Sequence, residues 1–136
     1  MSAQYLQFLI LLGALAAVLV SLQWVMNRQA KRSEGHSVPD TSAVDGGVTS
    51  SLKVYYFYSQ SCGPCRSMKT LTDSLCEEHD NLIKVDISKH SQLAREFGIA
   101  GVPSFIIVED GVIKTVKLGR VSESWLKTWC RRDKEP

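Results

Sequence analysis

The 136-residue sequence predicts an α/β domain with the element order βαβαββα, preceded by one transmembrane helix. Residues Tyr5–Met26 carry no charge, and 18 of these 22 residues are hydrophobic. Further along, β-branched and aromatic runs alternate with segments whose apolar residues recur at helical spacing. Such alternation is typical of a parallel sheet, and Asp110-Gly111 between the last two apolar runs indicates a hairpin. The hairpin adds an antiparallel edge, so we expect a mixed sheet.

The N-terminal segment, residues 1–27, is predicted to be a membrane anchor. Leu6–Val25 contains 20 residues, and a helix of that length spans the ~30 Å hydrocarbon core. Tyr5 and Trp24 lie where interfacial aromatic belts occur. A cleaved signal peptide is the alternative, but the first four residues carry no positive charge and no small-x-small cleavage site follows the apolar run. We therefore expect one span in membrane lipid.

The charges beside this span predict its orientation. Arg28, Lys31 and Arg32 follow the apolar segment, and no lysine or arginine precedes it. Because positive residues remain inside, we expect a single-pass membrane protein with a cytoplasmic domain. Since only three charges decide the orientation, a periplasmic or other extracytoplasmic location stays open.

Residues 28–51 are predicted to form a flexible linker, because they are rich in glycine, serine, threonine and aspartate and show almost no apolar periodicity. Such a linker would let the following domain, residues 52–134, range over the membrane surface.

The chain carries 16 basic and 14 acidic residues. This near-neutral balance argues against a nucleic-acid partner, which requires a concentrated basic face. The length favours one small domain over a multidomain enzyme.

The first half of the domain contains two strands and a helix. Val54–Tyr58 is a continuous β-branched and aromatic run, which predicts a strand buried on both faces. Pro64 is suited to the first turn of a helix, and apolar side chains recur at i, i+3 and i+7 over residues 68–75. Alternating apolar residues then predict a short strand over Ile83–Ile87.

The second half begins with a short helix over Leu93–Phe97, which Gly98 can end in a left-handed conformation. Two strands follow, Ser104–Val108 and Val112–Leu118, joined by the predicted hairpin. Ser122 is a suitable N-cap for a last helix that carries two tryptophans.

A pair of cysteines carries the chemistry. Cys62-Gly63-Pro64-Cys65 lies between the first strand and the first helix. Two intervening residues at a helix start allow both sulfurs to close one small disulfide ring. The helix N-terminus favours the thiolate form of Cys62, and thiolate is the species that attacks a disulfide. Cys65 lies one turn further and is expected to be more buried.

The segment from about Leu52 to Arg132 resembles the thioredoxin family. The resemblance rests on Cys62-Gly63-Pro64-Cys65 and on Gly98–Phe105, which is similar to the family segment that carries a cis-proline. It implies a thioredoxin-like three-layer fold with a cis-Pro loop at Pro103. It also implies that Cys62 attacks, that Cys65 resolves, and that Gly63, Pro64, Val102 and Pro103 bind the substrate.

The resemblance implies a thiol–disulfide oxidoreductase, and the apolar N-terminal segment would tether it to the membrane. The Gly-Pro pair matches reducing family members, so we expect a protein-disulfide reductase. Its partners would be disulfide-containing proteins and an upstream dithiol electron donor. No bound cofactor is expected, because the electrons reside in the Cys62–Cys65 pair. A membrane-anchored binding or assembly module with little turnover is the alternative.

The sequence departs from the family pattern in three ways. Tyr56 occupies the place of a buried aspartate, and Ser61 that of a tryptophan. The extra N-terminal strand and helix of the family are also not expected here. Losing the aspartate leaves open how Cys65 is deprotonated, because a buried carboxylate can accept that proton through water. The missing aspartate and tryptophan favour the binding alternative.

The remaining cysteines and the histidines are expected to be bystanders. Cys76 and Cys130 would lie on the same side of the sheet, as small buried hydrophobic groups in the cytoplasm or as a second disulfide if the domain is exported. No metal site is predicted, because one C-x-x-C supplies only two of four zinc ligands. His36, His79 and His90 show no ligand spacing and are expected on the surface.

Overall fold

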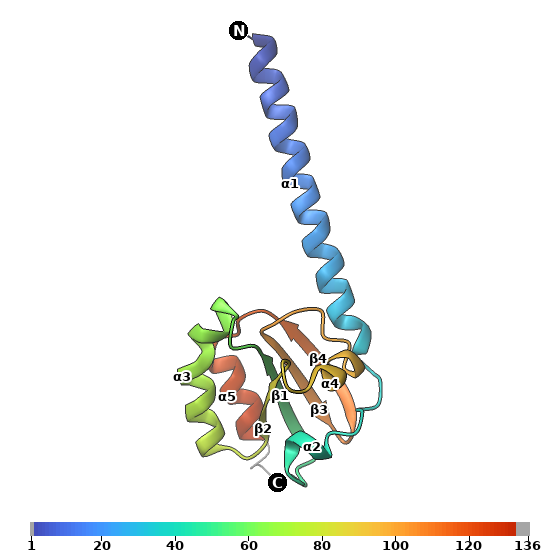
Figure 1. Ribbon diagram of the computed structural model, residues 1–136, viewed down its shortest axis with the longest axis vertical. Coiled ribbons are helices and arrows are strands. Elements are labelled where there is room, and N and C mark those ends of the chain that lie inside the picture. Colours follow the sequence, from blue (N-terminus) through green and yellow to red (C-terminus); the bar gives the residue numbers. More distant parts are fainter. Residues whose placement is uncertain (1, 133–136) are drawn as a thin grey trace.

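The structure of the chain, a computed structural model, describes residues 2–132, with the side chains of residues 2 and 30 excepted. Residues 133 and 134 of the predicted domain lie outside this range. The element order βαβαββα is confirmed after an N-terminal helical part (Figure 1). The elements are α1 (Ser2–Ala30), η1 (Lys31–Ser33), α2 (Ser42–Asp45), β1 (Leu52–Tyr58), α3 (Gly63–Glu78), β2 (Leu82–Asp86), α4 (Ser91–Glu96), β3 (Ser104–Glu109), β4 (Val112–Leu118) and α5 (Glu123–Arg131).

The four strands form one sheet in the order β2-β1-β3-β4. β1 and β2 are parallel, whereas β3 is antiparallel to both β1 and β4. The mixed sheet is therefore confirmed, but its parallel part is limited to β1 and β2. The reason lies in α4, because six helical residues advance the chain by only about 9 Å. The chain therefore enters β3 at the edge where β2 ended.

The sheet separates two apolar layers, as predicted for a strand buried on both faces. α3 and α5 cover one face and α4 lies over the other (Figure 1). Along β1, Tyr55 and Phe57 pack on the α4 side, while Val54 and Tyr56 pack on the α3 and α5 side. All four side chains are at most 1% exposed. β1 is thus the centre of the core.

Three predicted local signals are confirmed. The Trp125 N–H donates to Ser122 Oγ at 3.2 Å and caps α5. Gly98 ends the α4 region with a φ of +69°. Asp110 and Gly111 form a two-residue hairpin in which both φ angles are positive, which is the conformation that this residue pair favours.

Residues 34–38 lie along the outer edge of β4 and are hydrogen-bonded to it. The Gly35 N–H donates to the Ile113 carbonyl at 2.7 Å, and the Ile113 N–H donates to the His36 carbonyl at 3.0 Å. The Val38 N–H donates to the Gly111 carbonyl at 3.0 Å. This arrangement differs from the flexible linker expected over residues 28–51. Backbone pairing needs no apolar periodicity, so composition gave no sign of it.

Residues 41–53 are held by a buried polar cluster. Asp45 is 7% exposed and accepts hydrogen bonds from Thr41 Oγ1 and Lys53 Nζ, each at 2.8 Å. Tyr55 Oη donates to Thr41 Oγ1 at 3.0 Å. The bond from Lys53 is the main cause that lowers the pKa of the Asp45 carboxyl. These residues hold the segment against β1, and the division of the chain into anchor, linker and domain stays a prediction.

His79 is buried, although all three histidines were predicted to lie on the surface. His79 is buried at 8% exposure, whereas His36 is exposed and His90 is half-buried. The His79 N–H donates to the Leu75 carbonyl at 2.9 Å and ends α3, so its ring is covered where the chain turns into β2. Its Nδ1 has no hydrogen-bond partner within the described part of the chain.

α1 projects away from the domain (Figure 1). Within residues 2–132, the segment Ala3–Ser33 is the one helical stretch long and apolar enough to cross a membrane, with a mean hydropathy of 2.4 in its most apolar window. None of that window is buried against the domain. Membrane spans and signal sequences share these properties.

The Asp45 cluster generates a stability prediction. Asp45→Asn should lower the free energy of unfolding at neutral pH by about 1.5–3 kcal/mol, because it removes charged hydrogen bonds in a buried place. The folded-state pKa of Asp45 is lowered, so its stabilisation is present above its unfolded pKa and disappears as the pH falls through the folded value. The deficit of the variant should therefore shrink in acid.

Urea unfolding of both proteins at a series of pH values measures this difference. Asp40→Asn is the matched control, because Asp40 is exposed. Equal losses for the two variants would contradict the anchoring role of Asp45.

Candidate active site

The strand register brings several strand ends to one edge of the sheet. Tyr58 at the end of β1 lies opposite Asp86 at the end of β2. Ser104 at the start of β3 lies opposite Phe57 and Leu118. We call this edge, where β1, β2 and β4 end and β3 begins, the β1 carboxyl edge. Both the Cys62–Cys65 segment and the Val102–Pro103 segment adjoin it.

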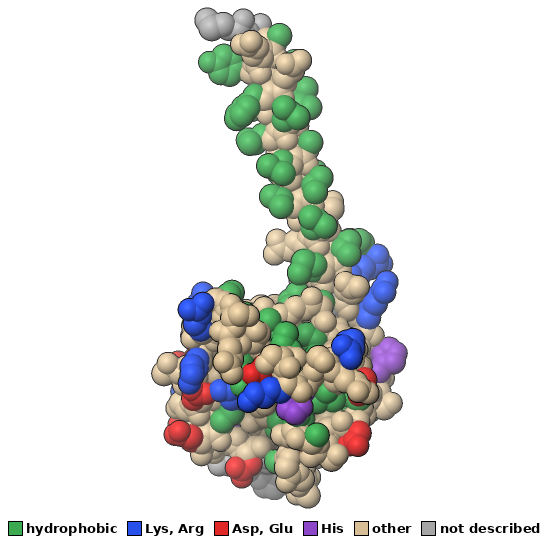
Figure 2. All heavy atoms as spheres, in the orientation of Figure 1, with side chains coloured by type: hydrophobic (Ala, Val, Ile, Leu, Met, Phe, Trp, Pro, Cys, Tyr) green, Lys and Arg blue, Asp and Glu red, His purple; other side chains and the backbone are tan. Residues whose placement is uncertain are grey.

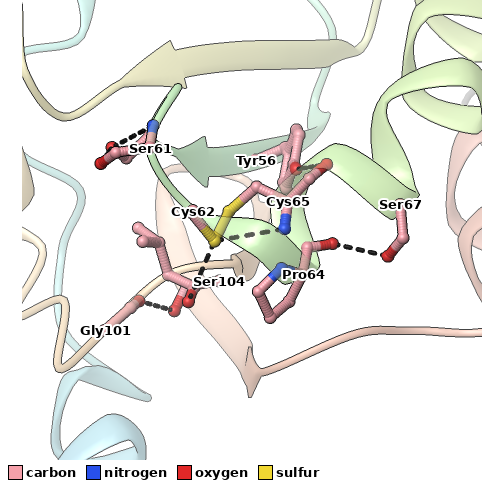
Figure 3. Close-up of a disulfide and its surroundings, with 10 residues drawn as sticks. Tyr56, Ser61, Cys62, Pro64, Cys65, Ser67, Gly101 and Ser104 are labelled. Atoms are coloured by element: carbon pink, nitrogen blue, oxygen red, sulfur yellow. Dashed lines mark hydrogen bonds between the residues drawn. A yellow bond between two sulfur atoms is a disulfide. The ribbon is translucent and has the colours of Figure 1, made fainter.

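Cys62 and Cys65 form a disulfide at the N-terminus of α3, with Cα atoms 5.2 Å apart (Figure 3). Cys62 is the N-cap, and its Sγ accepts a hydrogen bond from the Cys65 N–H at 3.2 Å. The N–H groups and dipole of the helix therefore act directly on this sulfur. Cys62 is half-buried and Cys65 is 4% exposed, in the order that the sequence predicted.

Hydrogen bonds to Ser59 hold the loop before Cys62 in place, and the two residues after Cys62 are exposed to solvent. The Ser61 N–H donates to Ser59 Oγ at 3.3 Å, and the Cys62 N–H donates to the Ser59 carbonyl at 3.2 Å. Gly63 and Pro64 are exposed, and a Cβ added at Gly63 would meet no atom within 4 Å. The surface beside Cys62 therefore has room for another chain.

The Val102–Pro103 peptide bond is cis and lies against the disulfide. Cys62 Sγ is 3.7 Å from the Val102 carbonyl oxygen. Ser104 Oγ donates to the Gly101 carbonyl at 2.6 Å (Figure 3). The Gly119 N–H donates to the Pro103 carbonyl at 2.8 Å. These bonds fix the loop on both sides. The fold thus brings together Cys62, Cys65, Gly63, Pro64, Val102 and Pro103.

Tyr56 lies directly behind the disulfide. Its ring stacks on Phe105 at a centroid distance of 4.7 Å, and its Oη donates to the Cys65 carbonyl at 3.4 Å. Burial raises the pKa of Tyr56 to about 12. At neutral pH the side chain is therefore an uncharged hydroxyl, which cannot take a proton as a carboxylate would.

Behind Cys65 lies a cavity of about 450 Å³ that the sequence did not predict. It is lined by Tyr56, Tyr58, Ser59, Gln60, Cys65, Arg66, Lys69, Thr72 and Lys84. Lys69 and Lys84 both pair with Asp73, and their hydrogen bonds lower the pKa of its carboxyl. Lys84, which stands between the apolar residues Ile83 and Val85 of β2, was the available signal. The cavity is large enough to hold several waters beside Cys65.

Cys76 and Cys130 are free thiols in this structure. Burial raises the pKa of Cys76 to about 11 and that of Cys130 to about 12. Cys76 Sγ donates to the Leu82 carbonyl at 3.4 Å. Cys130 is buried and Cys76 is half-buried, and both pack against the apolar layer under α3 and α5. Within residues 2–132, no three His, Cys, Asp or Glu side chains are placed to hold a metal ion.

A protein-family model described as Thioredoxin matches residues 42–132. The chain is 39% identical over 92 residues to the TPR repeat-containing thioredoxin TDX of Arabidopsis thaliana, covering 61% of this chain and 24% of that protein. The same-named protein of Oryza sativa subsp. japonica is covered over 33% of its length, so the chain spans a third or less of these two relatives.

Two further proteins are similar along most of their length. The chain is 27% identical over 95 residues to the thioredoxin of Porphyra purpurea, covering 67% of this chain and 89% of that protein. A mutant thioredoxin from Halobacterium salinarum NRC-1 superposes with a TM-score of 0.60 at 26% identity, covering 74% of this chain and 89% of that chain. α1 lies outside the matched family region, which begins at residue 42.

The different thiol environments predict an order of reactivity. In the reduced full-length protein at neutral pH, iodoacetamide should alkylate Cys62 at least about tenfold faster than Cys76 or Cys130, because the helix N-terminus favours its thiolate. Mass spectrometry of peptides at successive times measures the three rates. A Cys62→Ser variant should lose the fast reaction and keep the slow ones. Equally fast labelling of Cys76 would contradict this interpretation.

Proposed function

The chain belongs to the thioredoxin family, and we propose that it is a membrane-tethered thiol–disulfide oxidoreductase that reduces protein disulfides. The observation that carries the proposal is the position of Cys62. This sulfur lies at a helix N-terminus, half-exposed, and 3.7 Å from the Val102 carbonyl beside an open surface. A reactive thiol beside a docking surface is the requirement for attack on a protein disulfide.

The reaction transfers two electrons from the Cys62–Cys65 dithiol. The Cys62 thiolate attacks one sulfur of the substrate disulfide, and the other substrate sulfur leaves as a thiolate that takes up a proton. The Cys65 thiolate then attacks Cys62 Sγ, which breaks the mixed disulfide and releases the second substrate thiol. The protein is left with the Cys62–Cys65 disulfide. An upstream dithiol donor reduces it again, and no bound cofactor takes part.

Gly63, Pro64, Val102 and Pro103 are proposed to bind the substrate chain. Gly63 and Pro64 offer an exposed surface on one side of Cys62, and Val102 offers backbone groups on the other. Pro103 lacks an N–H, which leaves the neighbouring backbone available to an extended peptide. An extended segment held here would present its disulfide to Cys62 Sγ.

Before it attacks, Cys65 must lose its proton, and we assign the transfer to water in the cavity. Tyr56, with a pKa of about 12, cannot serve as the base. The cavity adjoins Cys65 and is lined by Lys69 and Lys84, whose positive charges favour a thiolate nearby. Water there can carry the proton towards solvent.

A Cys65→Ser variant should accumulate mixed disulfides with its substrates, because Cys62 can attack but nothing resolves the product. Non-reducing gels followed by mass spectrometry detect these adducts. Cys62→Ser should give none and should abolish reduction of a disulfide-bonded test protein such as insulin. Cys76→Ser is the matched control and should react as the unchanged chain does. Failure to trap any adduct, together with reduction no faster than in Cys62→Ser, would refute the enzyme proposal.

The second candidate function is a membrane-anchored binding or assembly module. It is favoured by Tyr56, which replaces a carboxylate with a neutral hydroxyl behind Cys65. A Cys62→Ala/Cys65→Ala chain that still supports the cellular role would favour this module, whereas loss of that role would favour the enzyme.

We also propose that α1 anchors the chain and that the domain is cytoplasmic. The apolar exposed surface of α1 and the charges of Arg28, Lys31 and Arg32 support this orientation. A reporter enzyme that is active only outside the cytoplasm, fused to the C-terminus, should therefore stay inactive. Activity of the reporter would place the domain outside, where an oxidising setting would favour a Cys76–Cys130 disulfide.

A further inference from the structure

The chain enters the domain from the edge at which Cys62 lies. Traced backwards from Val38, it runs beside β4 from Gly111 to Ile113, and the Glu34 carboxylate accepts the Val116 N–H at 3.0 Å. β4 ends at Leu118, which lies on the β1 carboxyl edge. η1 and α1 therefore continue past this edge. Figure 1 shows α1 rising from the side of the domain where α3 begins.

This junction is packed against the domain. Ser33 Oγ donates to the Phe97 carbonyl at 2.6 Å, and a Cβ added at Gly98 would lie 2.5 Å from Ser33 Oγ. Both η1 and the end of α1 contact β4. The direction of α1 relative to the β1 carboxyl edge is thus set by backbone pairing, by the Glu34 carboxylate and by a close approach at Gly98.

The helix leaves little distance between lipid and domain. Val25, the last residue of the expected span, and Ser33 are eight positions apart in the sequence, or about 12 Å of helix. The headgroup layer takes up about 5–7 Å of that length. The β1 carboxyl edge therefore faces the membrane and lies close to its surface.

The charges at this edge suit a lipid surface. Arg28, Lys31 and Arg32 surround the helix base, while Arg66 in the first turn of α3 and Arg120 after β4 are exposed. Figure 2 shows Lys and Arg side chains over the start of α3 and beside the base of α1. Anionic headgroups attract such side chains. This attraction would hold the edge that carries Cys62 towards the bilayer.

We propose that the substrates are disulfides held at the membrane surface, in segments of membrane proteins that lie next to the bilayer. The inference rests on the proposed reductase function and on α1 as a membrane span. A disulfide far above the membrane would meet the opposite side of the domain, whereas one beside the headgroups meets Cys62, Val102 and Pro103.

The test uses the full-length chain in liposomes together with defined probes. Each probe is a peptide with one internal disulfide, fused to both ends of a single apolar helix so that its insertion direction does not matter. A Gly/Ser spacer of about 5 residues keeps the disulfide near the bilayer, and one of about 40 residues lets it range about 35 Å away. Both probes share the membrane with the protein. Their reduction rates therefore differ only because the spacer length sets how far each disulfide lies from the bilayer. We expect the near probe to be reduced about tenfold faster.

The matched variant carries about 20 Gly/Ser residues between Arg32 and Ser33, which releases the domain from its fixed direction but keeps the contact of Ser33 with Phe97. Its near-to-far rate ratio should fall to about one. A far probe reduced as fast as the near probe by the unchanged chain would overturn this inference alone, as would a ratio that survives the insertion. Reduction of neither probe, nor of the free peptide, would refute the reductase proposal and this inference with it.

Discussion

Strand β1 is the constraint on which the rest of the structure depends. It pairs with β2 on one side and β3 on the other, and its side chains fill the apolar layers on both faces of the sheet. Because it ends at Tyr58, its position also sets where the loop to Cys62 leaves the sheet. The register with β3 then brings Pro103 opposite that loop. The packing of one central strand thus determines the geometry of the redox pair.

The sequence predicted those parts of the fold that rest on local signals. The apolar run of β1, the cap at Ser122 and the turn at Asp110-Gly111 each act through neighbouring residues, so they could be recognised without a structure. The direction of β3 depends on the short length of α4. The pairing of residues 34–38 with β4 depends on backbone groups far away in the sequence. The composition of a segment does not indicate contacts with residues far away in the sequence.

In the site, too, some residues could be predicted from local motifs and others could not. The cysteines and Pro103 were recognisable from motifs, whereas the ion pair of Lys84 and Asp73 was not. Lys84 lines the cavity from β2 and Asp73 lies on α3, so the two meet only in the folded chain. Tyr56 was recognised as a departure, and its surroundings explain how it is accommodated. It stacks on Phe105 and Tyr58, so an apolar contact occupies the place of a buried charge. The result is a core that avoids the cost of burying a carboxylate at this position.

The pairing between residues 34–38 and β4 has a consequence for a shorter form of the chain. An uncovered outer strand offers unpaired N–H and C=O groups to any other chain and is a template for self-association. Here the polypeptide that leads to the helix covers that strand itself, with the Glu34 carboxylate on Val116 and backbone bonds to Ile113 and Gly111. A fragment that begins at Leu52 would lose this cover together with Asp45, the buried partner of Lys53. Residues 34–38 therefore cover the strand edge at which a second chain could otherwise pair with the domain.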